Sequence, residues 1–360
     1  MKSELLFCRS EAEDEGKLHR LFMVETYLYK KLPDKKVQCQ NCAHYCVILP
    51  KNRGICGVRE NIDTKLYALN YGKIIACYID PIEKKPFFHF LPGSRSLSVA
   101  TVGCNFRCDN CQNWDISQSP KPQNPILGDD LSPEEIVKLA IKDKLPSISY
   151  TYTEPTIFSE YALDTMKLAK KAGLKNNWVT NGFLSKEVLE MVAPYLDVAN
   201  VDLKSFSDDF YIKNCSGKLQ PILDTLKRMK TRKIWVEITT LVIPTLNDNE
   251  KTFKNIANFI KKDLGAETPW HISQFSGAIS WKLQDLPETP IETLKMAYEI
   301  GKKAGLKYVY TGNVPGLPSE DTFCPKCGAL CINRTGYVVS RHDKNGKCPK
   351  CNEDLNLTLE

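Results

Sequence analysis

The feature that most constrains the fold of this 360-residue chain is a regular alternation of strand-like and helix-like segments from residue 95 to 315. Short runs rich in β-branched and aromatic residues predict strands at 96–102, 147–153, 175–180, 197–203, 233–243, 270–275 and 307–312. Amphipathic runs predict helices between them, most clearly at 132–145, 160–173, 249–265 and 291–305. Such alternation indicates an α/β fold built on a parallel sheet with right-handed crossovers.

Six or seven such units suit a full or partial barrel, whose active site lies at the carboxyl ends of the strands. An open doubly wound sheet is the alternative, although no Gly-rich fingerprint follows the first predicted strand. Polar side chains do gather at the predicted strand ends or within the strands: Glu154, Thr180, Asn181, Asp202, Lys204, Glu237, His271 and Gln274. Three of these features also have purely structural explanations: Glu154 precedes a proline and can be a turn residue, Asp202 and Lys204 can form an ion pair, and His271 can be a satisfied core histidine. Their convergence on one edge favours a functional site.

The fifteen cysteines of the chain fall mostly into three clusters. The clusters are Cys39, Cys42, Cys46 and Cys56; Cys104, Cys108 and Cys111; and Cys324, Cys327, Cys348 and Cys351. Cys8, Cys77, Cys215 and Cys331 are left over. No apolar run reaches the about 18 residues that span a bilayer, and the acidic N-terminus is unlike a signal peptide. We therefore expect a cytoplasmic metalloprotein with reduced thiols and no membrane association.

The central cluster supplies only three thiolates, whereas a closed structural zinc site needs four ligands. An iron–sulfur cubane with four irons held by three cysteines would leave one iron free to bind a substrate. The alternative is a zinc site completed by a distant histidine such as His89. The three cysteines directly follow the first strand of the predicted core.

The C-terminal cluster consists of two Cys-x-x-Cys knuckles separated by a hairpin-like sequence, which predicts a zinc ribbon over 320–360. We expect it to give structural support rather than to bind nucleic acid, and we expect Cys331 to be a spare thiol. The N-terminal cluster belongs to a Cys-rich module at 39–94, with short strands within 65–79. Four thiolates there could bind zinc or a second iron–sulfur cluster, and the compact, knuckle-like segment favours zinc. The sequence of residues 1–38 predicts a charged tail followed by a short helix at 18–32.

The run Cys104-x-x-x-Cys108-x-x-Cys111 after a first strand resembles the signature of the radical S-adenosylmethionine (radical SAM) superfamily. The resemblance implies a partial (β/α)6 TIM-like barrel and a [4Fe–4S] cluster whose free iron chelates S-adenosylmethionine. It also implies reductive cleavage to methionine and a 5′-deoxyadenosyl radical that abstracts hydrogen from a substrate.

Two groups within the superfamily are similar to this chain. The motifs "TNGF" at 180–183 and "DLK" at 202–204 resemble those of pyruvate formate-lyase-activating enzymes. Segments such as "DPIEKKPFFHFLPGS", "YTEPTIFSEY", "PWHIS" and the C-terminal "CPKCG…CPKC" resemble more closely the AmmeMemoRadiSam system radical SAM enzymes. That group implies Memo-like and AMMECR-like protein partners, and the chemistry implies a flavodoxin or ferredoxin-type electron donor.

The resemblance assigns cofactor contacts to Glu154, Thr180, Asn181, Asp202, Lys204 and His271. Glu154 stands where the activases have the Glu of a Gly-Gly-Glu motif that binds the amino group of S-adenosylmethionine, with Tyr152 and Thr153 replacing the glycines. Val179 replaces an Asp of the activases. Gln274, Ser276 and Gly277 replace an Arg and a His-Pro pair expected from the closer group, which weakens any inference about the substrate.

Three functions stay open. The first is a radical SAM enzyme, an oxidoreductase acting on an unidentified substrate, and the second is a glycyl-radical-enzyme activase. The third is a non-catalytic electron-transfer or nucleic-acid-binding metalloprotein. The net charge of +6 is mild, and basic-aromatic strips are missing, which disfavours nucleic acid.

Overall fold

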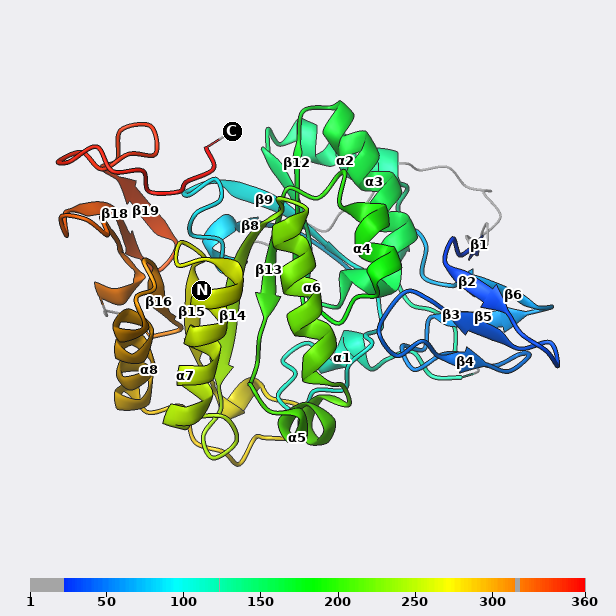
Figure 1. Cartoon of the computed structure of the whole chain (residues 1–360). Coiled ribbons are helices and arrows are strands. Elements are labelled where there is room, and N and C mark those ends of the chain that lie inside the picture. Colours follow the sequence, from blue (N-terminus) through cyan, green and yellow to red (C-terminus); the bar gives the residue numbers. More distant parts are fainter. Residues whose placement is uncertain (1–22, 123, 315–317, 360) are drawn as a thin grey trace. The chain divides into compact units, whose positions relative to one another are not determined.

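The computed structural model describes residues 23–122, 124–314 and 318–359 (Figure 1). The chain divides into two compact units, which do not follow the order of the sequence. The first contains 1–80, 95–106 and 113–197, and the second contains 81–94, 107–112 and 198–360. The first unit carries three of the seven predicted core strands, and the second unit carries the other four. The core domain predicted at 95–315 therefore contributes to both units.

The core strands of the first unit lie in the order β12-β11-β9-β8. Their bounds are β8 Ala76–Pro81, β9 Arg95–Ala100, β11 Ser147–Tyr150 and β12 Lys175–Thr180. Strands β9, β11 and β12 are parallel, with Ser147 level with Ser96 and Lys175. Because parallel strands in this register end at one edge, the loops that follow them are neighbours.

The helices of the first unit follow its strands as capping rules predict. They are α1 Trp114–Ser117, α2 Pro133–Lys142, the 3-10 turn η2 Pro155–Phe158, α3 Ser159–Lys171 and α4 Lys186–Val192. Ser132 and Glu135 form a capping box before α2, with Pro133 at the first helical position. The buried side chains of α2 recur at helical spacing, so its apolar face lies against the core, whereas α3 is buried on all sides over its first five residues.

The Cys-rich module of the first unit consists of short antiparallel sheets. One has the order β1-β6-β5 (Val24–Glu25, Lys65–Ala68, Arg59–Ile62), and another has the order β2-β3-β4 (Tyr29–Lys31, Val37–Cys39, Val47–Ile48). A two-stranded pair joins β7 Lys73–Ile74 to β10 Asp129–Asp130. The helix predicted at 18–32 is wrong over its described residues, which form β1 and β2; residues 18–22 lie outside the described residues. Backbone pairing with β6 and β3, which leaves Val24 and Tyr29 partly buried, overrides the helical spacing.

The core strands of the second unit lie in the order β16-β15-β14-β13. Their bounds are β13 Val198–Asp202, β14 Trp235–Val242, β15 Trp270–Gln274 and β16 Val309–Gly312, and all neighbours are parallel. The helical elements are η1 Ile82–Lys84, α5 Asp208–Phe210, η3 Tyr211–Cys215, α6 Leu219–Thr231, α7 Glu250–Phe259, η4 Ile260–Leu264, η5 Gly277–Ile279, α8 Ile291–Ala304 and η6 Pro318–Glu320. The α/β class and all seven predicted core strands are confirmed. Closure into a partial barrel stays a prediction.

The C-terminal part of the second unit is a three-stranded antiparallel sheet with the order β17-β18-β19 (Thr322–Phe323, Leu330–Thr335, Val338–Arg341). Its small core combines cysteines with Ile332 and Leu355. So few apolar side chains cannot stabilise a separate module of this size, which is why a cross-link or metal is expected. Among the helices of the described residues, none is long and apolar enough to cross a membrane.

Candidate functional site

The three central cysteines lie on one loop that follows β9. Cys104 belongs to the first unit, and Cys108 and Cys111 belong to the second. All three are partly buried, and the segment from Cys104 to Cys111 is eight residues long.

Cys104 receives hydrogen-bond donors that favour a thiolate. The backbone N–H of Phe106 lies 3.4 Å from the Cys104 sulfur, and the Asn181 side-chain amide lies 4.0 Å from it. That amide also donates to the Asn105 side chain at 2.7 Å. The side-chain oxygen Oδ1 of Asn181 in turn accepts from the backbone N–H of Phe183 at 2.9 Å. Asn181, which the sequence predicted at the end of a strand, is therefore fixed next to the first cysteine.

Gly103 explains how the loop leaves β9. Its φ of +101° belongs to the region that favours glycine, and a Cβ would lie 2.9 Å from both the Cys56 carbonyl oxygen and Val58. No other residue could let the backbone pass so close. The segment carrying Cys104 thus packs directly on the segment that carries Cys56.

Glu154 lies in a buried network at the ends of β11 and β12. Its Oε1 accepts from the Thr156 N–H at 3.1 Å, the Thr156 hydroxyl at 2.6 Å and the Thr180 hydroxyl at 2.7 Å, and its Oε2 accepts from the Asn181 N–H at 2.8 Å. Burial raises the pKa of Glu154, and these hydrogen bonds lower it without cancelling the rise. The sequence placed Glu154, Thr180 and Asn181 in one site, and the structure brings them into direct contact.

Tyr152 occupies a position where the resembling activases have glycine. Its φ is +63°, so this tyrosine adopts the left-handed backbone conformation that glycine adopts most readily. The Tyr152 hydroxyl bonds to Asp80, and its carbonyl accepts from the Asn113 side chain at 2.8 Å. A left-handed tyrosine costs of order 1 kcal/mol, which these contacts offset.

Cys108 lies in the second unit against Cys215, a residue that the sequence left unassigned. Backbone hydrogen bonds join the two segments, from Arg107 N to the Cys215 carbonyl at 3.0 Å and from Asp109 N to the Asn214 carbonyl at 2.9 Å. The hydrogen bond from the Cys215 thiol lowers the pKa of Cys108, and the same contact raises the pKa of Cys215. Cys215 is fully buried and therefore serves as a thiol donor that favours a Cys108 thiolate.

Lys204 adds a positive charge beside Cys108. Its ammonium lies 2.7 Å from the Asp202 carboxylate, so the predicted pair exists. Burial opposes the charge on Lys204, but Asp202, Cys108 and Cys215 together raise its pKa well above the ordinary value. The lysine is a permanent cation near a thiol of the triad.

His271 lies in a different network from these groups. Its Nε2 is 2.7 Å from the Glu237 carboxylate, which also accepts from the backbone N–H groups of Phe88 and His89, both at 3.0 Å. The His271 ring packs edge-on against Phe88 at 4.7 Å. This arrangement favours the interpretation of a satisfied core histidine, and its predicted contact with a cofactor stays a prediction. His89 itself bonds to the Leu355 carbonyl and the Tyr310 hydroxyl rather than to a metal centre.

The ligand atoms of the C-terminal cysteines lie together as a metal site requires. The sulfur atoms of Cys324, Cys327, Cys348 and Cys351 are within 4.8 Å of one another, with the pairs Cys324–Cys351 and Cys327–Cys348 at 3.5 and 3.6 Å. Cys331 is buried outside this set, and its thiol donates to the Ala329 carbonyl. The four predicted cysteines are therefore placed so that they could hold a metal ion, with Cys331 outside the set, and metal binding itself stays a prediction.

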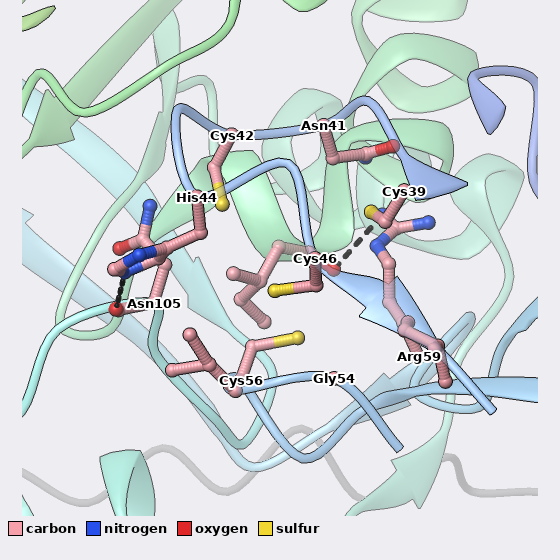
Figure 2. Close-up of a pocket in the computed structure, with 12 residues that line it drawn as sticks. Cys39, Asn41, Cys42, His44, Cys46, Gly54, Cys56, Arg59 and Asn105 are labelled. Atoms are coloured by element: carbon pink, nitrogen blue, oxygen red, sulfur yellow. Dashed lines mark hydrogen bonds between the residues drawn. The ribbon is translucent and has the colours of Figure 1, made fainter. Parts of the chain in front are cut away.

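The N-terminal cysteines surround one pocket of the first unit (Figure 2). The pocket is also lined by His44, Arg59 and Asn105. Arg59 is buried and forms an ion pair with Glu160 at 2.6 Å. Burial raises the pKa of Cys39 to about 12, and it raises the pKa of Cys42 well above its ordinary value. Bound cations would be needed to hold these groups as thiolates.

The central donors fit an iron–sulfur cluster held by three thiolates. The thiolate form of Cys104 is favoured by the backbone N–H of Phe106 and the side-chain amide of Asn181. The thiolate form of Cys108 is favoured by the Cys215 thiol and by Lys204. Thiolate ligands with N–H and S–H donors around them are typical of such clusters. The Oε2 atom of Glu154 accepts one hydrogen bond, and a carboxylate oxygen can accept two.

Comparison with known proteins agrees with this chemistry. The family model of the radical SAM superfamily matches residues 98–260, which include all three central cysteines. The chain is 46% identical over 340 residues to the uncharacterized protein MJ0808 of Methanocaldococcus jannaschii, covering 94% of this chain and 100% of that protein. This chain belongs to the radical SAM superfamily, and it is an enzyme.

Two further proteins share parts of the chain. The (2S)-3-sulfopropanediol dehydratase activating enzyme of Klebsiella oxytoca is 22% identical over 166 residues, covering 44% of this chain and 52% of that enzyme. The crystal structure of a radical SAM methyltransferase from Sphaerobacter thermophilus is 15% identical, with a TM-score of 0.49, and covers 66% of this chain and 71% of that one.

Sequence reasoning missed Cys215, Asn105 and the pairing of Arg59 with Glu160. Cys215 is more than a hundred residues from Cys108 in sequence, so no spacing could join them. A fully buried arginine implies a partner, but only the fold shows which one.

Proposed function

We propose that this chain is a cytoplasmic radical SAM oxidoreductase that acts on an unidentified substrate together with Memo-like and AMMECR-like partner proteins. A [4Fe–4S] cluster on Cys104, Cys108 and Cys111 would bind S-adenosylmethionine at its free iron and supply, with one electron from a flavodoxin or ferredoxin-type donor, the 5′-deoxyadenosyl radical that abstracts hydrogen. The observation that carries the proposal is the three-thiol loop directly after β9 in a superfamily member.

The residues of the chain would have distinct roles in this function. Phe106 N, the Asn181 amide and the Cys215 thiol stabilise the thiolates. Oε2 of Glu154 has room for one more donor, which suits the amino group of S-adenosylmethionine. Lys204 provides positive charge beside Cys108. In the C-terminal ribbon, four thiolates with no open position suit a structural zinc ion.

The test uses the full chain, reconstituted anaerobically with iron and sulfide, reduced, and mixed with S-adenosylmethionine. We expect 5′-deoxyadenosine from the wild type, only background from Cys108→Ala, and wild-type yield from the matched control Cys331→Ala, which removes a buried thiol outside every predicted ligand set. A wild type whose full, reducible cluster gives no 5′-deoxyadenosine, alone or with the Memo-like protein added, would contradict the proposal.

A second candidate, a glycyl-radical-enzyme activase, is favoured by the similarity to the sulfopropanediol dehydratase activating enzyme. It would form 5′-deoxyadenosine in the same assay, so turnover does not separate the two. Electron paramagnetic resonance does: an activase leaves a stable radical on a partner's glycine, and a small-molecule enzyme leaves none.

A further inference from the structure

We propose that Cys39, Cys42, Cys46 and Cys56 hold a second iron–sulfur cluster of the [4Fe–4S] class, with Arg59 as a hydrogen-bond donor to it, and not the zinc ion that the compact sequence favours. The proposal concerns the Cys-rich module alone and does not depend on the radical chemistry. It rests on the spacing of the four sulfur atoms, on an unpartnered buried donor, and on the packing of the pocket.

The C-terminal ribbon provides an internal standard for sulfur spacing. Zinc bonded tetrahedrally to sulfur at about 2.3 Å places its four sulfur atoms about 3.8 Å apart, and the ribbon pairs at 3.5 and 3.6 Å match this. In the described part of the chain, Cys, His, Asp and Glu side chains form one group of three or more whose ligand atoms all lie within 4.8 Å of one another. That group consists of the four ribbon cysteines. The N-terminal cysteines are all described and do not reach that spacing.

The N-terminal sulfur atoms nevertheless belong to one site. All four cysteines line the same pocket (Figure 2). A single metal ion would require the thiols to converge, whereas each cysteine of a four-iron cluster binds a different iron. Ligand sulfurs on different irons are separated by the cluster core. The wider spacing around a shared space is therefore what a polynuclear cluster requires.

Arg59 supplies the second observation. Its two terminal nitrogens are engaged, with the Glu160 carboxylate at 2.8 and 2.6 Å and the Ile157 carbonyl at 3.1 Å. Its Nε is buried and has no hydrogen-bond partner among the described residues, although the side chain lines the pocket. An unpaired buried donor costs about 1–3 kcal/mol. A cluster sulfur in the pocket would accept this hydrogen bond, and Glu160 keeps the local charge balanced.

The pocket is built into the segment that carries Cys104. The His44 Nε2 lies 2.8 Å from the Asn105 carbonyl oxygen, and Cys42 forms a β-bridge with Leu184. Gly103 packs on the Cys56 carbonyl, where a Cβ would clash at 2.9 Å. All these residues belong to the first unit. Filling the pocket would thus also order the backbone on both sides of Cys104.

The decisive experiment counts metals in the full chain after anaerobic reconstitution. The variant is Cys104→Ala/Cys108→Ala/Cys111→Ala, which removes the central site and leaves the pocket unchanged. We expect about eight irons and eight sulfides per chain in the wild type, and about four of each in the variant, since each cluster holds four. Both should contain one zinc. A variant without iron overturns the proposal, whether or not it binds a second zinc.

A reciprocal variant, Cys42→Ala/Cys46→Ala, should also retain about four irons, now on the central site. Cys331→Ala is the matched control and should keep all eight. If the reciprocal variant kept eight irons, the pocket would not be the second site, and the proposal would fail.

The role of Arg59 is tested by its conservative variant in the triple-alanine background. Arg59→Lys keeps the positive charge and loses the Nε–H donor. Fewer N–H donors to cluster sulfur make reduction harder, so the midpoint potential should become more negative while the iron content stays at about four. An unchanged potential would overturn the assignment of Arg59.

Discussion

The N-terminal pocket and the C-terminal ribbon each gather four cysteines, but they use them differently. In the ribbon, two Cys-x-x-Cys knuckles bring the sulfur atoms within 4.8 Å of one another around a small core. In the pocket, the cysteines come from β3 and three loop positions and line a wider space beside a buried ion pair. Equal numbers of thiols therefore occur at two different sulfur spacings, and we propose that this spacing, which the fold imposes, selects the metal that each site binds.

The largest effect in this comparison should come from the ribbon. Cys327→Ala removes one ligand of the zinc ion that we propose for the ribbon, and structural zinc contributes about 10–16 kcal/mol of apparent binding free energy to folding. We expect loss of one zinc per chain and rapid proteolysis within 320–359, while Cys331→Ala keeps the zinc. Limited proteolysis and zinc analysis check this, and a protease-resistant, zinc-free ribbon would contradict it.

Next to the pocket, the buried ion pair between Arg59 and Glu160 should contribute to the free energy of unfolding. Both side chains are 1% exposed, so Glu160→Gln leaves a buried charge uncompensated. We expect a loss of about 3–5 kcal/mol in the free energy of unfolding by denaturant titration. The exposed pair Lys254–Glu250 is the matched control, and Glu250→Gln should cost less than about 1 kcal/mol. Equal losses in the two variants would mean that the buried pair is unimportant.

The ribbon should also respond to pH through His89, whose Nδ1 lies 3.0 Å from the Leu355 carbonyl. Burial lowers the pKa of His89 to about 4. Between that value and the ordinary pKa of about 6.5, the unfolded chain binds a proton that the folded chain does not. The free energy of unfolding should therefore fall by about 3 kcal/mol as the pH drops from 6.5 to 4.

His89→Gln should remove this component of the pH dependence, and His342→Gln, at an exposed position of the ribbon, should not. Denaturant titrations at several pH values measure both. A His89→Gln variant with the same pH slope as the wild type would show that another group is responsible.

The smallest expected effect concerns the link between the pocket and Cys104. His44→Ala removes the hydrogen bond to the Asn105 carbonyl at 2.8 Å, which is worth roughly 1 kcal/mol. We expect that loss in the free energy of unfolding, with iron content unchanged. Loss of iron from this variant would mean that His44 acts as a ligand rather than as a link.

The core strands could be predicted because they are short, rich in β-branched and aromatic residues, and separated by capped helices. Glu154, Thr180 and Asn181 could be predicted as one group because parallel strands end at one edge. The prediction of a helix at 18–32 was wrong over the described residues, because β1 and β2 form there by pairing with later strands. Cysteine spacing predicts that Cys39 to Cys56 bind a metal. It does not predict the distances between their sulfur atoms, because loops set them.

Long-range partners could not be predicted for a related reason. Cys215 meets Cys108, and Arg59 meets Glu160, across about a hundred residues of sequence. Neither pair leaves a local pattern, since each depends on where separate elements meet. His271 shows the reverse case, in which a residue at a suggestive position is engaged by Glu237 in the core.

The measurement that tests the central claim most directly is electron–nuclear double resonance on the reduced protein with S-adenosylmethionine labelled with ¹⁵N at the amino group. The triple variant Cys39→Ala/Cys42→Ala/Cys46→Ala should be used beside the wild type, so that the signal is assigned to the central cluster. If S-adenosylmethionine binds the free iron, ¹⁵N coupling appears in both proteins and disappears in Cys108→Ala. Absence of coupling in both, with cluster and S-adenosylmethionine at full occupancy, would contradict the radical SAM function proposed for this chain.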